Sequence, residues 1–283
     1  MMRALEPEMY DLIFRLVKDR IPAPPVHRYG ACRPRVPDEI CFKGLFWRFV
    51  TGAAWETIEA FLDWQVSDTT LRARRDEWIE AGVFDDLMEH TLAEYDRLVG
   101  LDCDDVIIDG SNQLAPGGGP NTGNYVGSKG RKGFKWSCGV DGAGVGIGFV
   151  IEAANRNDYP LLGPTLDAIT TRASTARIGT LHLDRGYGYK SLPDRLEGYP
   201  IDNVAVIARN QPNQGRIPMV GFGHRWKVER TNAWLTNFRQ LKINWDRTTK
   251  HRHAAVSLAF TIISLYKIVD HLKANDLPLQ TIR

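Results

Sequence analysis

The second part of the chain, from about residue 102 to 283, alternates short apolar segments with amphipathic ones, and this order constrains the fold more than any other feature. Val106–Asp109, Thr180–Asp184 and Asn203–Ala208 are apolar runs of strand length, and Phe134–Asp141 with Val145–Ala153 flanks a glycine-containing turn, which predicts a hairpin. Segments of helical spacing separate and follow the strands, at residues 159–173, 190–196, 226–238 and 254–273. This order predicts an α/β domain in which a mixed sheet is flanked by helices.

Residues 1 to about 100, in contrast, show helical patterns. Hydrophobic residues recur at helical spacing over residues 40–50, a short amphipathic segment covers residues 55–64, and Ser67 suits the N-cap of a third segment. That third segment is rich in arginine and carries Arg72, Arg74 and Arg75. Two short helices joined by a tight turn, the second rich in arginine, predict a helix-turn-helix; a small helical bundle with a basic face is the alternative.

Charge is unevenly distributed along the chain, although the net charge is only +2. From Asp76 to Asp109 there are twelve acidic residues and one basic residue, Arg97. From Ala205 to His253 there are ten Lys or Arg and two acidic residues, a local balance of +8. Such segregation indicates a polyanion-facing surface built from the second half of the chain; ion pairs along solvated helix faces are the alternative.

The four cysteines have neither CxxC spacing nor a histidine at zinc-finger distance, so we expect buried or free thiols in a reducing compartment. The first ten residues are mixed and acidic, which does not fit a signal peptide. The longest apolar stretch, Ala254–Val269, is too short and too polar to span a bilayer. The sequence therefore predicts a cytoplasmic protein.

Three carboxylates have contexts that differ from those of the other acidic residues. Asp109 and Asp184 each end an apolar strand segment, and Glu229 lies inside a helical one. Ligands of open α/β sheets gather beyond the carboxyl ends of the strands, so the three side chains can converge. Two Asp and one Glu suit a pair of Mg²⁺ ions about 3.5–4 Å apart, the arrangement that drives in-line attack on phosphodiesters. Strand-end turn residues are the alternative, and other acidic residues, Asp102, Asp104 and Asp105, are expected in solvent.

Basic residues accompany these carboxylates. Arg225 precedes Glu229 by four residues, which fits either a helical ion pair or a clamp on a phosphate beside the metal ligand. Lys129, Arg131 and Lys132 follow a glycine-rich segment without nearby acidic residues. They suit salt-sensitive contacts with a DNA backbone, and a mobile surface loop is the alternative.

These motifs together resemble a known family. The chain resembles the DDE transposases of bacterial insertion sequences, specifically the fifth insertion-sequence family, close to the fourth. The resemblance covers about residues 30 to 270, and the stretches that carry it are Arg48–Trp55, Ser67–Trp78, Ile108–Ser111, Gly127–Lys129, Gly139–Gly144, Asp184–Tyr187 and Arg225–Thr231 with Trp234–Leu235 and Phe238–Arg239.

The resemblance implies an RNase H-like catalytic domain over residues 101–283, preceded by a helical DNA-binding region over residues 1–100. It implies that Asp109, Asp184 and Glu229 hold two Mg²⁺ ions, for which Mn²⁺ can substitute, with Arg225 beside them. It also implies a homodimer that acts on terminal inverted repeats and target DNA by strand cleavage and strand transfer, in association with the nucleoid. The DNA contacts expected are Arg72, Arg74, Arg75, Lys129, Arg131, Lys132, Lys227, Arg230, Arg239 and Lys242.

Two positions depart from the pattern of these families, in which a Tyr and a Lys accompany the Arg and the Glu. Phe222 stands at the Tyr position and Thr236 at the Lys position, so Arg239 or Lys242 is expected to supply the DNA contact. Glu229 follows Asp184 by 45 positions, which leaves no room for a large β-rich insertion. A catalytically silent DNA-binding relative and an RNase H-like nuclease that is not a transposase are the alternative functions.

Overall fold

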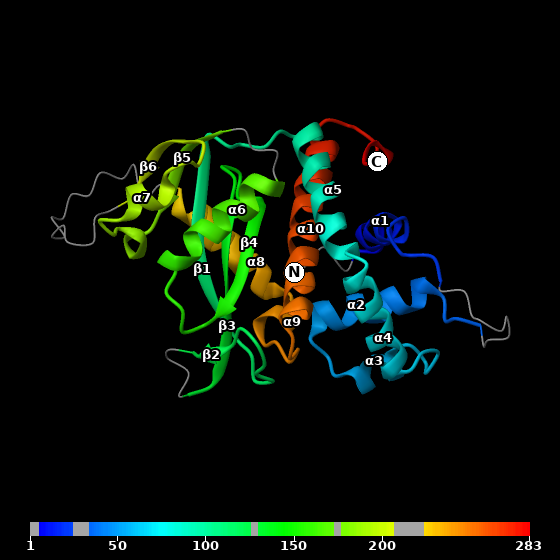
Figure 1. Ribbon diagram of the computed structural model, residues 1–283. Helices are drawn as coiled ribbons and strands as arrows, with labels where there is room; N and C mark the ends of the chain where they lie inside the picture. Colours follow the sequence, from blue (N-terminus) through cyan, green and yellow to red (C-terminus); the bar gives the residue numbers. More distant parts are fainter. Residues whose placement is uncertain (1–5, 25–33, 126–129, 173–176, 207–223) are drawn as a thin grey trace.

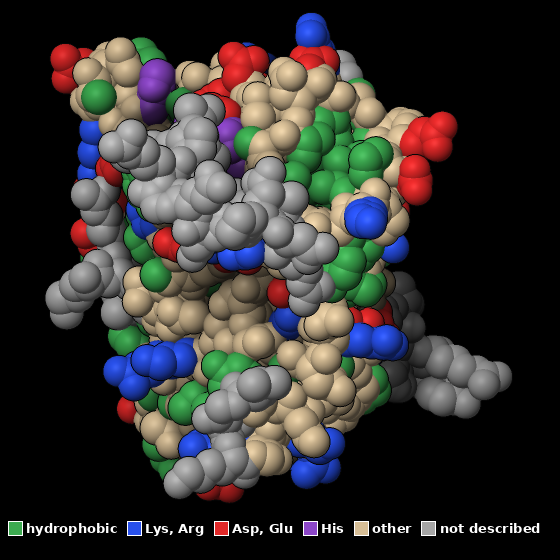
Figure 2. Space-filling view, turned by 90° about the vertical axis from the view of Figure 1, so that its left-hand side faces the viewer, with side chains coloured by type: hydrophobic (Ala, Val, Ile, Leu, Met, Phe, Trp, Pro, Cys, Tyr) green, Lys and Arg blue, Asp and Glu red, His purple; other side chains and the backbone are tan. Residues whose placement is uncertain are grey.

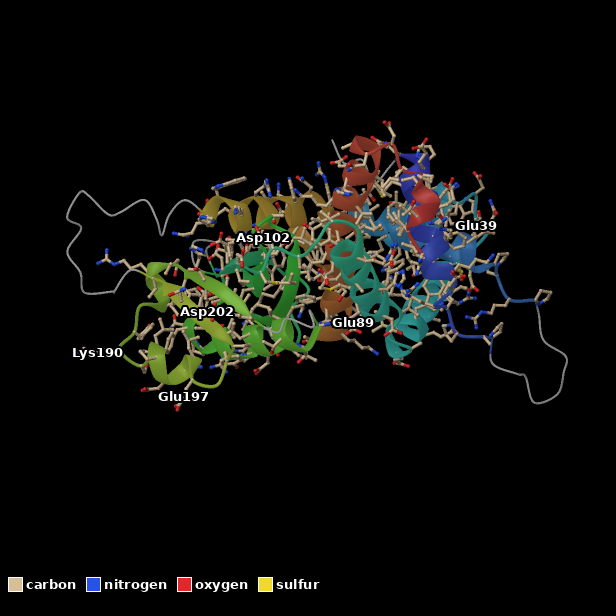
Figure 3. All side chains as sticks on the ribbon, turned by 90° about the horizontal axis from the view of Figure 1, so that it is seen from above. Glu39, Glu89, Asp102, Lys190, Glu197 and Asp202 are labelled. Atoms are coloured by element: carbon tan, nitrogen blue, oxygen red, sulfur yellow. The ribbon has the colours of Figure 1, made fainter. Side chains whose placement is uncertain are left out.

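The computed structural model describes residues 6–24, 34–125, 130–172, 177–206 and 224–283. An α/β part and a helical part lie side by side (Figure 1). Seen from above in Figure 3, Glu39 lies at the helical end, and Lys190, Glu197 and Asp202 lie at the opposite end.

The α/β part is built on one mixed sheet. Its main strands are β1 (Asp105–Leu114), β3 (Lys132–Val140), β4 (Gly146–Ala153), β5 (Ile178–Leu183) and β6 (Ile201–Ala205). Across the sheet the strands follow the order β4-β3-β1-β5-β6, and the short β2 (Gly123–Asn124) pairs with the start of β3. Strands β1, β3 and β4 form an antiparallel meander, whereas β5 and β6 run parallel to β1. This connectivity is that of the RNase H-like fold, as the resemblance implied.

Helices cover both faces of the sheet, with α6 in front and α8 behind in Figure 1. On one face α6 (Leu162–Arg172) packs on β3 and β4, and on the other α8 (Arg225–Asn237) and α10 (Thr249–Ala274) pack on β1, β3 and β4. Glycines in the strands permit this close approach. A Cβ at Gly139 or Gly148 would collide with Ile169 of α6, and one at Gly146 would collide with Phe260 of α10.

The helical part contains α1 (Pro7–Lys18), α2 (Asp38–Thr51), α3 (Trp55–Phe61), α4 (Asp68–Glu80) and α5 (Val83–Leu98). Ser67 is the N-cap of α4, because its side chain accepts a hydrogen bond from the Thr70 N–H, so the predicted cap is confirmed. The helix predicted over residues 55–64 ends earlier, since Asp63 and Trp64 have positive φ angles of 50° and 57°.

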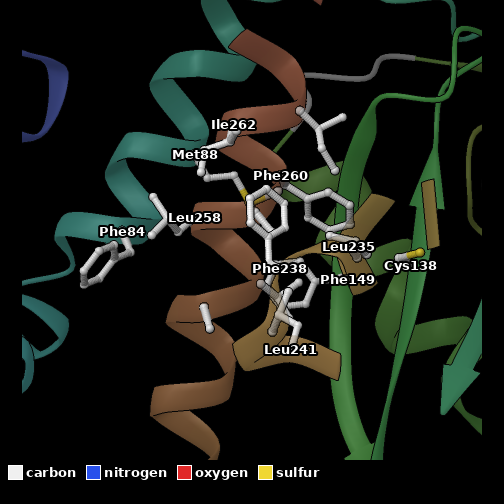
Figure 4. Packing of buried hydrophobic residues seen from close by; sticks show 14 of the residues in the cluster. Phe84, Met88, Cys138, Phe149, Leu235, Phe238, Leu241, Leu258, Phe260 and Ile262 are labelled. Carbon is white, nitrogen blue, oxygen red and sulfur yellow. The ribbon is translucent and has the colours of Figure 1, made fainter. Parts of the chain in front are cut away.

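One hydrophobic core joins the two parts (Figure 4). Phe84 and Met88 of α5 lie against one side of α10, and Phe149 of β4 lies on the other side, next to Phe260. By length and hydropathy α10 alone among the described helices resembles a membrane-spanning helix, but 78% of its most apolar stretch is buried inside the molecule. This is the pattern of a core helix.

Most predicted elements of the α/β part are present with shifted ends. The structure adds a short helix, α9 (Arg239–Lys242), which the sequence patterns did not indicate, and it begins the helical segment predicted over residues 159–173 with a 3-10 helix, η2 (Tyr159–Leu161), before α6. The predicted short helix of residues 190–196 is α7 (Leu192–Leu196). Cys41, Cys103 and Cys138 form no disulfides, as expected, and Cys32 lies outside the described residues.

Candidate active site

Two aspartates lie next to each other where β1 and β5 run side by side. Ile108 pairs with Leu183 in the parallel register, so the next residues along each strand, Asp109 and Asp184, are neighbours. Asp184 leaves β5 and caps the 3-10 helix η3 (Arg185–Tyr187), its Oδ1 accepting a hydrogen bond of 2.7 Å from the Gly186 N–H. This cap holds the Asp184 carboxylate at the end of its strand.

Helix α8 presents a polar stripe to the same edge of the sheet. Arg225, Glu229 and Asn232 follow one another at spacings of four and three residues, so they lie on one helical face. The Asn232 amide lies 3.5 Å from Oδ2 of Asp109 and accepts a hydrogen bond of 2.8 Å from the Trp136 indole N–H. Arg225 Nη2 lies 3.4 Å from Glu229 Oε1, and the Glu229 side chain is 58% exposed. Glu229 therefore stands one turn from the residue that contacts Asp109.

The burial of Asp109 and the carboxylates near it favour a bound cation. The pKa of Asp109 is raised to about 6: burial raises it most and the nearby carboxylates of Asp184 and Asp158 add to the rise, while the hydrogen bond from the Gly110 N–H and the charge of Arg225 oppose it. Carboxylates that repel each other while partly removed from water need a positive partner to remain ionised. A bound divalent cation would serve this need, since hard carboxylate oxygens are its usual ligands.

A family model described as "Transposase DDE domain" matches residues 103–265, which include β1 to β6, α8 and most of α10. The chain belongs to this transposase family. A protein of Burkholderia cepacia assigned as a transposase for insertion sequence element IS402 is 32% identical over 152 residues, which are 52% of this chain and 69% of that protein. The resemblance to bacterial insertion-sequence transposases is thus confirmed, and its placement in the fifth family stays a prediction.

Two solved structures of the Mos1 transposase are also similar in outline. The match to the paired-end complex with left transposon end covers 87% of this chain and 82% of the Mos1 transposase chain, at 14% identity and a TM-score of 0.29. The pre-cleavage transpososome covers 88% and 81%, at 14% identity and a TM-score of 0.28. Similarity at this level adds nothing to the family assignment. As a DDE-type DNA transposase the protein is an enzyme of a family that uses divalent metal ions.

Several residues around Asp109 carried no signal in the sequence of this transposase. A Cβ at Gly110 would collide with the Asp158 carboxylate, which pairs at 2.6 Å with the buried Lys135 ammonium. Tyr187 is fully buried, and burial together with the charges of Asp158, Asp109 and Asp184 raises the pKa of its phenol. The spacing of Asn232 from Glu229 was the one available clue, because residues three apart share a helix face.

One prediction about the acidic residues was wrong. Asp105 was expected in solvent, but it begins β1 and its carboxylate lies 2.5 Å from Nε2 of His182 and 3.3 Å from Nδ1 of His224. Asp105 is the first residue of β1, and because β1 pairs with β5 its side chain lies next to His182 of that strand. Asp102 and Asp104 are exposed, as expected.

The predicted DNA contacts fall into three groups. Arg131, Lys132, Arg239 and Lys242 are exposed, and Arg72, which pairs with Asp68, is half-exposed. Arg75, Lys227 and Arg230 are partly buried; Arg75 pairs with Asp76 and Asp246, Lys227 contacts His224, and Arg230 lies between the Trp226 and Trp234 rings. Lys129 lies outside the described residues, as does Phe222, which stands at the Tyr position of the family pattern.

Arg74 is the exception, because the structure turns it inward. It is 4% exposed, its guanidinium pairs with Asp38, and it donates to the Val36 carbonyl at 3.2 Å. Arg74 therefore holds α4 against the start of α2 and is not placed to contact DNA, which corrects the prediction for this residue. Helical periodicity predicts which residues share a face of α4, but it does not predict which of these faces packs against α2.

Proposed function

We propose that this transposase binds the terminal inverted repeats of an insertion sequence and catalyses metal-dependent strand cleavage and strand transfer. One observation carries the proposal most: Asp109 and Asp184 are neighbours across β1 and β5, and the Arg225–Glu229–Asn232 stripe of α8 lies against the same edge. This arrangement supports a site to which three carboxylates from distant parts of the sequence would contribute.

Asp109, Asp184 and Glu229 would hold two Mg²⁺ ions, with Asp109 between the other two carboxylates. When bound, the ions would supply activation of the attacking oxygen and stabilisation of the leaving oxygen. Arg225 would orient a phosphate of the scissile strand, since its fork matches phosphate oxygens. Asn232 would hold the Asp109 carboxylate in position through its amide.

For DNA binding we assign end contacts to the helical region, residues 1–100, and catalysis to residues 101–283. Arg48, Arg72 and Arg75 surround the Trp55 ring, with guanidinium carbons 4.3, 4.9 and 5.3 Å from its centroid. They line a hollow of about 660 Å³ whose other wall includes Trp245 and Arg247. Trp245 is 60% exposed and offers a ring face for stacking. Arginine and tryptophan at the junction of the two parts fit a nucleic-acid contact.

A second basic area would hold the DNA backbone nearer the carboxylates. Lys and Arg side chains are spread over the middle and lower part of the face in Figure 2, whereas acidic side chains gather mostly along its upper part. Arg131, Lys132, Arg239 and Lys242 would contribute sequence-independent contacts. Pairing of two transposon ends calls for two copies of the catalytic part, so we propose a homodimer in the DNA complex and association with the nucleoid.

The test is strand cleavage and joining of labelled end-containing DNA by Asp109→Asn, Asp184→Asn and Glu229→Gln. Each variant should lose both reactions in Mg²⁺ while retaining DNA binding in a gel shift. Asp202→Asn is the matched control, because Asp202 is an exposed carboxylate at the far edge of the sheet, on β6, and it should stay active. Near wild-type activity in any of the three variants would reject the carboxylate site.

The same assay separates the alternatives. A wild-type protein that binds ends but cleaves nothing with Mg²⁺ or Mn²⁺ would be a silent DNA-binding relative. Cleavage without preference for end sequences and without strand joining would identify a plain nuclease.

A further inference from the structure

A second cluster of metal-binding side chains lies on the same elements as the carboxylates of the active site. Asp105 precedes Asp109 by four residues on β1, His182 of β5 precedes Asp184 at the end of that strand by two, and His224, just before α8, precedes Glu229 by five. Residues an even number apart on a strand face the same side, so the cluster and the carboxylates share one face of the sheet. We call Asp105, His182 and His224 the His–Asp cluster.

The geometry of the His–Asp cluster is convergent. One ligand atom from each residue lies within 4.8 Å of the other two, and this is the one such trio in the described parts of the chain. His182 Nε2 is 2.5 Å and His224 Nδ1 is 3.3 Å from the Asp105 carboxylate. The two imidazole rings stack with centroids 4.7 Å apart and planes 16° apart. The His182 ring is 3% exposed, so its direction is fixed by the sheet.

The site is open to an ion from solvent on one side. The Asp105 and His224 side chains are 27% and 32% exposed, while His182 forms the floor. Nδ1 of His224 lies 3.1 Å from the Lys227 ammonium, which is a donor only, and this hydrogen bond requires the tautomer in which Nδ1 carries a lone pair. A positive group therefore already lies in front of this ligand atom, and a metal ion would compete with it.

The donor set identifies the class of ion. Two imidazoles and one carboxylate are the ligands of Zn²⁺ and its neighbours Co²⁺ and Ni²⁺, whereas Mg²⁺ prefers oxygen alone. We propose that the His–Asp cluster binds one transition-metal ion of the Zn²⁺ class, separate from the ions of the catalytic carboxylates. Such an ion would join β1, β5 and the first turn of α8, the helix that carries Arg225 and Glu229.

Binding requires a rearrangement of one proton. In the metal-free cluster His182 Nε2 donates to Asp105, so Nε2 must release its proton and the neutral ring must carry one on Nδ1. Nδ1 of His182 is buried and has no hydrogen-bond partner among the described residues. An unpaired buried N–H costs free energy, which weakens the site and makes binding reversible.

Co²⁺ titration of the full-length metal-free protein tests the proposal, with the visible absorption of Co²⁺ as the readout. Absorption should saturate at one equivalent in the presence of excess Mg²⁺. His224→Ala, which changes a partly exposed residue, should weaken binding at least about tenfold, and Asp105→Asn should do the same. Lys227→Met should tighten binding, because it removes the competing ammonium. If the cluster only stabilised the fold, Lys227→Met would not bind Co²⁺ more tightly than the wild type.

Controls make each outcome decisive. His271→Ala, at the far end of α10, should leave the titration unchanged. Asp109→Asn and Glu229→Gln should also keep Co²⁺ binding, so failure of the proposed catalytic site and failure of the His–Asp cluster are distinguishable. The proposal is overturned if Co²⁺ gives no saturable absorption, or if the His224 and Lys227 variants bind it as the wild type does.

Zn²⁺ should also raise the Tm of the wild type but not of His224→Ala, since an ion that binds only the folded state stabilises it. Equal Tm shifts in both proteins would place the ion elsewhere. Any effect of Zn²⁺ on strand cleavage depends on the proposed function of α8 and is a separate measurement.

Discussion

At the scale of single residues, Asp109 lies where it could bind a metal ion, but its surroundings disfavour the ionised carboxylate. Its folded-state pKa of about 6 lies above the ordinary value of 3.8, because burial and neighbouring carboxylates oppose ionisation. This group therefore favours folding most at pH values below 3.8, and that contribution is lost as the pH rises through 6. A metal site built from such a group destabilises the metal-free protein at neutral pH.

We predict that Asp109→Asn increases the free energy of unfolding of the metal-free protein at pH 8, by on the order of 1–3 kcal/mol. The neutral amide removes the ionised carboxylate from its partly buried place. Urea unfolding at pH 4 and pH 8 measures the effect, which should nearly vanish at pH 4. Asp202→Asn should show no comparable gain at pH 8. A variant less stable than the wild type at pH 8 would contradict this account of Asp109.

Residues with a local signature were predictable from the sequence, and residues defined by distant partners were not. Asp109 and Asp184 end apolar strands, and Arg225 and Glu229 share a helix face, so short windows of sequence indicated them. Asp105 and Arg74 lie in equally ordinary windows, but their directions depend on His182 and Asp38, far away in the chain. The assignment of the three carboxylates to one metal site remains a prediction.

At the scale of elements, ion pairs between helices account for part of the charge segregation. Lys250, in the first turn of α10, forms an ion pair of 2.8 Å with Glu80 of α4, and the neighbouring His251 ring is hydrogen-bonded at 2.8 Å to Asp76 of the same helix. Arg252 is buried and donates to the carbonyls of Gly118, Pro120 and Asp246. The basic second half therefore directs some of its charge toward the acidic first half, and the surface left for DNA is smaller than the sequence suggested.

The remaining exposed cations should determine the salt dependence of DNA binding. We predict that Lys132→Gln and Lys242→Gln each weaken binding to any duplex and reduce the slope of log K against log salt by about 0.9. Lys250→Gln should change the slope less, because Glu80 already neutralises that ammonium. Fluorescence anisotropy with a short duplex at several salt concentrations measures the slopes. Equal slopes in all three variants would contradict this division of the charges.

Packing of α6 on the sheet depends on the absence of a side chain in β3. A Cβ at Gly139 would collide with Cδ1 of Ile169, so Gly139→Ala should destabilise the protein by about 1–3 kcal/mol. Ile169→Val removes the colliding atom. We therefore expect the double variant to be more stable than the sum of the single effects predicts, by about 1 kcal/mol.

Chemical denaturation of the four proteins of this cycle measures the coupling. Gly163→Ala on α6 is the control, since the nearest atom to its Cβ is 3.7 Å away, and it should be neutral or stabilising. Additive effects of the Gly139 and Ile169 variants would show that α6 does not rest on this contact. The sequence predicted both elements but not their contact, which depends on how the sheet twists beneath the helix.

At the scale of the whole molecule, α10 makes the helical and α/β parts one folding unit. It packs along α5 on one side and against β4 and α8 on the other, so either part alone would expose an apolar face. We predict that the full chain unfolds in a single calorimetric transition and that residues 101–283 alone aggregate or stay partly unfolded. Two separate transitions, or a well-folded fragment, would show that the proposed functional regions are also independent domains.

The central claim is that three carboxylates, which the chain brings from β1, the end of β5 and α8, hold the catalytic metal ions. Anomalous diffraction from Mn²⁺ in crystals of the transposase with end-containing DNA tests it most directly. The account predicts anomalous peaks in contact with oxygens of Asp109, Asp184 and Glu229, at the short distances of direct coordination. Peaks that touch none of the three side chains, or that leave Glu229 away from the ions in the DNA-bound state, would contradict it.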